Sequence, residues 1–165
     1  PEELPADEII GGTERGNTLH LLMEELVAGL LAPTPEAIGE RVQHLIAQAD
    51  PTQPLDAAEL TRTVCRTLAL PEVASAWPRL QAEFTTFASE GVAGKEVLTR
   101  GIADALVVDD EGQITAVFDW KSDVAPTALV KSRYVEQVRD YLRATGATRG
   151  FVVYMTPGEV AVVSP

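Results

Sequence analysis

Residues 116–121 read AVFDWK, an apolar run that ends in an acid, a tryptophan and a lysine. Alternate side chains of an extended strand face opposite sides, so Asp119 and Lys121 share one face while Phe118 and Trp120 share the other. One interpretation is an ion pair at the end of a surface strand, which contributes little stability. The other is a metal-binding carboxylate beside a catalytic lysine. Because D-x-K occurs by chance in many chains, its sequence context has to decide between them.

The length and composition of the chain limit the classes of protein to consider. Its 165 residues, 45% of them hydrophobic, suit one globular domain with its own core. The longest apolar run, around residues 26–32, is too short to cross a membrane, so no membrane association is expected. The N-terminus has neither a basic segment nor an initiator Met, so we expect one domain of a longer protein and no signal peptide.

Cysteine content and net charge limit the cellular compartment and the ligands that this chain could have. The single cysteine, Cys65, excludes an intramolecular disulfide and a metal site built from cysteines of this chain, and a reducing cytoplasm is its natural setting. The formal net charge is -12, from 25 acidic and 13 basic side chains. Such a chain does not coat nucleic acid with a broad basic surface. A polyanion would have to be bound locally, through metal ions, a few basic residues or another part of a longer protein.

Hydrophobic periodicity predicts a mainly helical first part, residues 13–80. Helices are expected over 13–32, 33–49 and 54–70, and proline with acidic residues opens the second and third. Five apolar residues recur at helical spacing in the first of them: Leu19, Leu22, Met23, Leu26 and Leu30. This stripe predicts an amphipathic helix that packs on a core.

Residues 81–165 instead predict a sheet with one helix. Two strands flank a turn at 109–112, a helix with Gly146 as its C-cap follows over 125–147, and two short β-rich runs end the chain. A strand, helix and strand in succession imply a right-handed parallel crossover, here added to antiparallel strands. We therefore predict a single α/β domain over 1–165, with a central mixed sheet, helices on both faces, and a site where strand ends meet the first helix.

Asp104 is the second acid of interest. It lies in the segment GIAD, fifteen positions before Asp119 across the predicted hairpin, so antiparallel pairing can bring the two carboxylates together. Adjacent carboxylates repel one another unless a cation lies between them, and Mg²⁺ is the usual occupant of such a position. The alternative is a polar residue on a solvent face, which the apolar neighbours of Asp104 disfavour.

Taken together, these motifs resemble the PD-(D/E)XK nuclease superfamily, and specifically its RecB-type branch. That branch forms the C-terminal nuclease domain of helicase–nucleases that process DNA ends, and it occurs in related exonucleases. Its pattern is a histidine on the first helix, G-x-x-D, D-x-K, and Y-x-x-Q-x-x-x-Y on the following helix. The matching residues are, in order, His20, Gly101, Asp104, Asp119, Lys121, Tyr134, Gln137 and Tyr141. The match covers about residues 13–155 and implies a restriction-endonuclease-like core preceded by the helical N-terminal third.

The resemblance implies a catalytic metal site. Its ligands would be His20, Asp104, Asp119 and the main-chain carbonyl of Trp120, and the ion would be Mg²⁺ or Mn²⁺. Lys121 would orient or activate the attacking water and stabilise charge on the scissile phosphate. An isolated helical histidine is more often a core or surface residue than a ligand, so the assignment of His20 depends on the other motifs.

Other residues would support this site. Tyr134, Gln137 and Tyr141 would contact substrate or brace the site, since the last two lie on one helix face. Glu83 resembles the acid that this branch often carries before G-x-x-D, although it could simply be exposed. Glu24 lies four residues after His20, where it either supports the metal ligands or is solvated. His44 has no such neighbours and is read as a surface residue.

The implied activity is a metal-dependent DNA nuclease that acts exonucleolytically on single-stranded ends, within a cytoplasmic helicase–nuclease of DNA repair or recombination. No iron–sulfur cluster is expected because the cysteines are missing, and no ATP site because a Walker motif is absent. Strand separation would belong to a helicase region of the same protein or to another protein bound to it. Two alternatives are a nuclease-like module that no longer cuts and serves as scaffold or DNA-end sensor, and an α/β domain whose motif residues do not converge.

Overall fold

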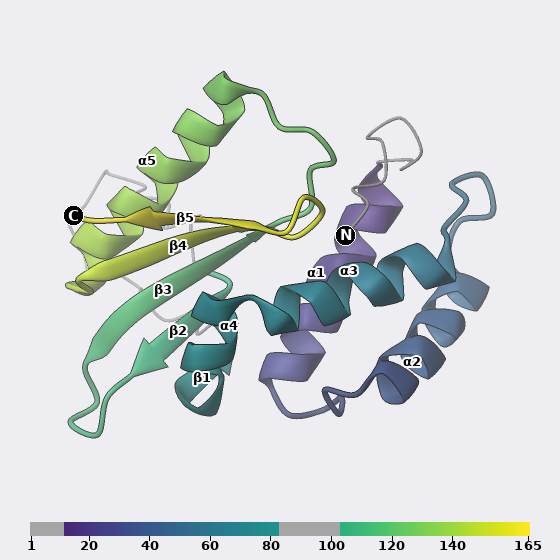
Figure 1. Cartoon of the computed structure of the whole chain (residues 1–165), viewed down its shortest axis with the longest axis horizontal. Coiled ribbons are helices and arrows are strands. Elements are labelled where there is room, and N and C mark those ends of the chain that lie inside the picture. Colours follow the sequence, from purple (N-terminus) through teal and green to yellow (C-terminus); the bar gives the residue numbers. More distant parts are fainter. Residues whose placement is uncertain (1–11, 83–102) are drawn as a thin grey trace, which may run out of the picture.

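The computed structural model describes residues 12–82 and 103–165, which form a five-stranded mixed sheet with helices on both faces (Figure 1). The chain begins with the helices α1 (Thr13–Val27), α2 (Pro35–Gln48), α3 (Ala57–Ala69) and α4 (Pro71–Ala76), followed by the short 3-10 helix η2 (Trp77–Arg79). The first part of the chain is therefore helical, as predicted.

The strands lie in the sheet in the order in which they occur in the chain. They are β1 (Leu80–Ala82), β2 (Ala105–Val108), β3 (Ile114–Lys121), β4 (Arg149–Tyr154) and β5 (Glu159–Val163). Neighbouring strands are antiparallel except β3 and β4, which are parallel and joined by α5 (Ala128–Thr145). This mixed sheet confirms the predicted α/β class and is consistent with a restriction-endonuclease-like fold, while the extent of the domain over 1–165 stays a prediction.

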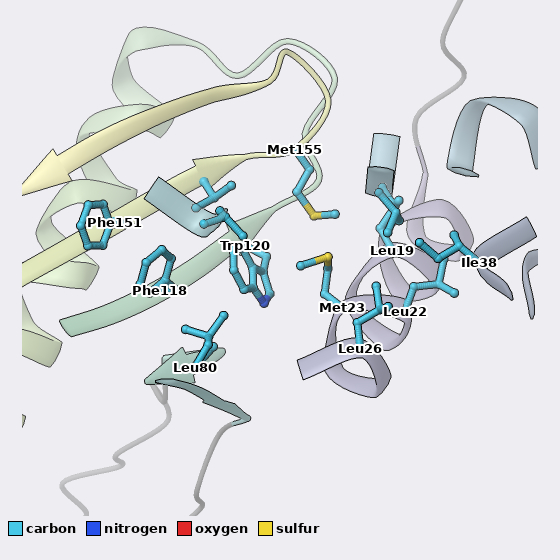
Figure 2. Close-up of a cluster of buried hydrophobic side chains, with 14 of the residues drawn as sticks. Leu19, Leu22, Met23, Leu26, Ile38, Leu80, Phe118, Trp120, Phe151 and Met155 are labelled. Atoms are coloured by element: carbon cyan, nitrogen blue, oxygen red, sulfur yellow. The ribbon is translucent and has the colours of Figure 1, made fainter. Parts of the chain in front are cut away.

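The two faces of the sheet bury separate hydrophobic clusters. On one face, Phe118 and Trp120 of β3 pack with side chains of α1 to α4, and Figure 2 shows Trp120 and Met155 pointing toward Met23. On the other face, α5 covers β3 and β4 and packs Val138 into the second cluster. The strand alternation predicted from AVFDWK is thus confirmed, because its large aromatic residues all lie on the face that the N-terminal helices cover.

Helix α1 is shorter than predicted. It ends at Val27 rather than near residue 32, and Gly29 follows with φ 75°, a left-handed conformation that glycine adopts without strain. Leu30, expected on the buried stripe, is 82% exposed. The stripe itself is correct up to Leu26, which is buried. An apolar run can therefore continue past the end of a helix when the chain turns away from the core.

The crossover helix α5 matches its prediction closely. The Thr127 side chain accepts a hydrogen bond from the Val130 N–H at the first turn, and Gly146 closes the helix in the left-handed conformation. Helix α4 was not predicted; it starts at Pro71, directly after Leu70, which is extended. None of the helices within the described ranges is long and apolar enough to cross a membrane.

Candidate active site

The C-terminal end of β3 carries a buried ion pair on the face toward α5. The Lys121 Nζ atom lies 2.7 Å from Asp119 Oδ2, and these side chains are only 14% and 5% exposed. Within the described residues this Asp119 oxygen accepts no further hydrogen bond. Charged groups rarely lie this deep without a specific reason, because removing them from water is costly. The pair is therefore unlike an ordinary surface ion pair at a strand end.

Helix α5 holds the Lys121 ammonium in place. Lys121 Nζ donates to Gln137 Oε1 at 3.1 Å and lies 4.2 Å from the centre of the Tyr134 ring. Gln137 in turn donates through Nε2 to the Tyr141 hydroxyl at 2.8 Å. The three residues that the sequence placed on one helix therefore come together around the lysine of the neighbouring strand.

A fourth residue, Asp123, belongs to this group although the sequence pattern did not include it. The Tyr134 hydroxyl donates to its two carboxylate oxygens at 3.0 and 2.9 Å. Burial, and then this hydrogen bond, raise the pKa of Tyr134 to about 12. The phenol therefore stays protonated at neutral pH, where it can orient its ring over Lys121 but cannot act as a base.

Helix α1 approaches the same strand end from the other side. His20 Nδ1 lies 3.8 Å from Asp104 Oδ1, and Asp104 Oδ2 accepts a hydrogen bond of 2.7 Å from the Trp120 N–H. His20, Glu24, Asp104 and Trp120 line a small hollow of about 60 Å³. The structure thus brings His20 and Glu24 to Asp104, and it places the Trp120 peptide against that carboxylate. His44 lies on the exposed surface of α2, as predicted.

Asp119 is under electrostatic strain. Burial raises its pKa to about 6, the Lys121 charge opposes this shift, and the nearby Asp104 charge adds to it. The pKa stays high although an ammonium is in direct contact, so burial and carboxylate repulsion outweigh that single positive charge. Ala105 pairs with Phe118, which places Asp104 beside Asp119. The expected approach of the two acids is therefore present.

The donor groups fit a divalent cation by their chemistry. Carboxylate oxygens suit Mg²⁺, the hollow beside Asp104 has room for an ion or a water, and a cation would relieve the repulsion between Asp104 and Asp119. Nevertheless, in the part of the chain that the structure describes, no three His, Cys, Asp or Glu side chains converge to enclose an ion. Glu83 and Gly101 lie outside the described residues.

A buried ion pair next to this site was not predicted from the sequence. Arg15 of α1 is 4% exposed and contacts Glu59 of α3 through two hydrogen bonds of 3.1 and 2.7 Å. It also donates to the Ser122 carbonyl at 2.8 Å and to the Thr156 hydroxyl at 3.0 Å. The sequence held one indication that Arg15 is buried. It lies four residues before Leu19, so it extends the buried stripe of α1 by one turn toward the N-terminus.

A mixed α/β sheet that presents an acid and a lysine at the end of its central strand, with a second acid just before the neighbouring strand, has the architecture of a restriction-endonuclease-like nuclease. Comparison with known proteins agrees with this class. A model of the PD-(D/E)XK nuclease superfamily matches residues 2–163, so the chain belongs to that superfamily. The family resemblance inferred from the motifs is confirmed, and nucleases of this superfamily generally use divalent metals such as Mg²⁺.

A curated relative is an ATP-dependent helicase/nuclease subunit from Heliobacterium modesticaldum. The chain is 27% identical to it over 161 residues, which cover 85% of this chain and 11% of that protein. The chain therefore spans a small part of the length of this relative. A helicase/nuclease is the kind of protein in which the RecB-type branch was expected.

Proposed function

We propose that this chain is a metal-dependent DNA nuclease domain that hydrolyses phosphodiester bonds. The observation that carries the proposal is the position of Lys121, whose ammonium lies between Asp119 and Gln137 at the end of β3. A lysine held with little freedom beside a buried acid is suited to a reaction in which charge develops on a phosphate. Membership of a nuclease superfamily supports the same conclusion.

Each side chain of the site has a role in this proposal. The Lys121 ammonium orients the attacking water and stabilises negative charge on the scissile phosphate. Gln137 and Tyr134 keep that ammonium aimed at the strand end, because one accepts its hydrogen bond and the other lies beneath it. Their rigid support matters, since small displacements of a catalytic group cost large factors in rate.

The proposed metal ligands are His20, Asp104, Asp119 and the Trp120 carbonyl, with Glu24 beside them at the hollow. When bound, a divalent cation supplies Lewis acidity toward the phosphate and lowers the pKa of a bound water. Without the cation, Asp119 holds the Lys121 side chain in place through their ion pair. The acidic residues therefore serve both the cation and the lysine.

The finer assignments belong to the proposal as well. We place the activity at single-stranded DNA ends, as an exonuclease that works with a helicase region of a longer protein in repair or recombination in the cytoplasm. The name of the Heliobacterium relative, a helicase/nuclease, favours this setting. The formal net charge of -12 also favours it, because such a chain binds DNA weakly alone and gains from a partner that delivers the strand.

Cleavage assays on labelled single-stranded and duplex DNA test this function. We expect cleavage with Mg²⁺ or Mn²⁺, no cleavage with a chelator, and progressive shortening from ends rather than internal cuts. His20→Ala should lower the activity strongly, whereas His44→Ala, a change on the exposed surface of α2, should leave it unaltered. Absence of cleavage with either metal, both for this chain and with a helicase region attached, would contradict the proposal. DNA binding without cleavage would then favour the scaffold or end-sensor alternative.

A further inference from the structure

The first turn of α1 lies directly against the peptide that follows Lys121. Gly16 packs on Ser122 so closely that an added Cβ would lie 3.0 Å from Ser122 Oγ. The neighbouring Arg15 donates through Nη1 to the Ser122 carbonyl at 2.8 Å. Two adjacent residues of the helix therefore contact the same residue of the strand end, one through close approach and one through a charge-assisted hydrogen bond.

Arg15 is itself fixed from a third direction. Its guanidinium forms a two-pronged pair with Glu59 of α3, and Glu59 Oε1 also accepts from the Thr63 hydroxyl at 2.7 Å. The Thr156 hydroxyl, just beyond β4, accepts from Arg15 and donates to the Ser122 carbonyl at 3.1 Å. The planar guanidinium thus joins two helices and the ends of two strands, a geometry that a lysine cannot reproduce.

This network links the helix that carries His20 to the strand end that carries Lys121. His20 follows Arg15 by five residues, about 7.5 Å along the helix axis. On the strand side, the Ser122 carbonyl belongs to the residue that directly follows Lys121. A shift of α1 relative to β3 would therefore alter the approach of His20 to Asp104, which is 3.8 Å in this structure.

We propose that Arg15, with Glu59 behind it and Gly16 beside it, is a positioning residue that sets the placement of His20 relative to the D-x-K strand end. The inference rests on the proposed nuclease function. Arg15 does not touch the reacting atoms; it acts through α1 and through the Ser122 peptide. Its loss should therefore reduce turnover more than DNA binding.

A double substitution can remove the network while keeping the fold. Replacement of a buried ion pair by apolar residues of similar volume is often neutral or stabilising, so Arg15→Met/Glu59→Met should keep its melting temperature. We expect its kcat for DNA cleavage to fall about 10- to 100-fold with little change in KM, the scale expected when catalytic groups are misplaced.

The chain offers a matched control in a second arginine–glutamate pair that involves α1. Arg41 of α2 donates through Nε to Glu25 of α1 at 2.8 Å and contacts it again through Nη2, so this pair joins two helices and not a helix to a strand end. Arg41→Met/Glu25→Met should therefore leave kcat unaltered. Equal loss in both double variants, or in neither, would overturn the proposal.

A milder variant covers the case in which the double variant does not fold. Arg15→Lys keeps the charge opposite Glu59 but cannot reach Glu59, Ser122 and Thr156 together. A role in stability alone predicts wild-type turnover for this variant once it is folded, whereas a positioning role predicts a lower kcat. Wild-type turnover in folded Arg15→Lys would overturn the positioning role.

A readout independent of catalysis separates this inference from the proposed function. The chain has two histidines, so the imidazole NMR signals of His20 can be assigned against those of His44. Arg15→Lys should shift the His20 signals and leave those of His44 in place, even if the wild type proves inactive. Unchanged His20 signals would refute the positioning role, and an inactive wild type with shifted signals would refute the nuclease proposal alone.

Discussion

The two faces of β3 bury side chains of opposite character along the stretch AVFDWK. On the face toward the N-terminal helices, Phe118 stacks on Phe151 with ring centres 4.5 Å apart, within a wholly apolar cluster. On the face toward α5, the strand instead carries the ionisable pair Asp119 and Lys121, whose side chains are only 5% and 14% exposed. The apolar face stabilises the strand, and that stability allows the polar face to hold groups that burial disfavours. Because neighbouring side chains of β3 point to opposite faces, one face contributes stability and the other carries the reactive groups.

This separation predicts its largest effect at Lys121. Lys121→Ala should reduce the cleavage rate about 10²- to 10⁴-fold or more, because the group is assigned to the reaction. The fold and the metal-induced stabilisation should be retained, but the melting temperature of the metal-free protein should fall, because the variant leaves the buried Asp119 carboxylate without its cation. Lys131→Ala is the matched control, since Lys131 lies on α5 and its ion pair with Glu159 is solvent-exposed. Substantial cleavage by Lys121→Ala would show that Lys121 is not required for the reaction. The face toward α5 would then not be the reactive face of β3.

The opposite result is expected on the apolar face. Phe118→Ala removes a fully buried ring and should lower the free energy of unfolding by about 3 to 5 kcal/mol. At a temperature where the variant is folded, its kcat should stay within a few-fold of the wild type. Chemical denaturation measures the first quantity and DNA cleavage the second. Val162→Ala, at a position 60% exposed, should change stability by less than about 0.5 kcal/mol. A kcat loss as large as that of Lys121→Ala would show that the faces are not independent.

The sequence predicted the difference between the two faces of β3 because that difference depends only on residues that are close together in the chain. The alternation along AVFDWK predicted the two faces, and the spacing of Gln137 and Tyr141 predicted their common side of the helix. The error at Leu30 arose because apolar periodicity continues where the chain turns at Gly29. Only tertiary packing shows which leucine is covered.

The missed contacts are those between distant segments. Arg15 and Glu59 are 44 residues apart, and neither flanking sequence indicates that the other exists. Asp123 lies outside the motif pattern, and only the fold shows that it accepts a hydrogen bond from the Tyr134 hydroxyl. A single sequence carries the residues that perform the proposed chemistry in a recognisable order, whereas the groups that hold them in place are defined by the fold.

Asp119 allows a smaller and more specific test of the polar face. Asp119→Asn keeps the shape and removes the charge, so the metal-free protein should be equally stable or more stable, by about 1 to 2 kcal/mol. The same change should abolish the stabilisation that Mg²⁺ or Mn²⁺ gives the wild type. Melting curves of both proteins, with and without millimolar metal, measure these effects. A less stable Asp119→Asn protein with an unaltered metal response would show that Asp119 is only a structural partner of Lys121.

The stability difference between Asp119→Asn and the wild type should depend on pH in a defined direction. The folded pKa of Asp119 is about 6, above the value of about 3.9 for an unfolded aspartate, so the folded state binds the proton more tightly. The associated stability is fully present below about pH 4 and is lost as the pH rises through 6. The advantage of Asp119→Asn over the wild type should therefore grow between pH 4 and 6 in the absence of metal. An advantage that does not change with pH would contradict the strained carboxylate.

The smallest effect is expected at two tyrosines that flank Lys121 on the polar face. Tyr134→Phe removes two hydrogen bonds to Asp123 but keeps the ring over the ammonium, so stability should fall by about 0.5 to 1 kcal/mol and kcat by no more than about threefold. Tyr154→Phe is the control, because its buried hydroxyl has no hydrogen-bond partner among the described residues and its removal should be neutral or stabilising. Urea unfolding and cleavage rates of the two variants measure the difference. A kcat loss near that of Lys121→Ala in Tyr134→Phe would mean that the hydroxyl itself takes part in the reaction, and the polar face would then contain a second reactive group in place of a passive support.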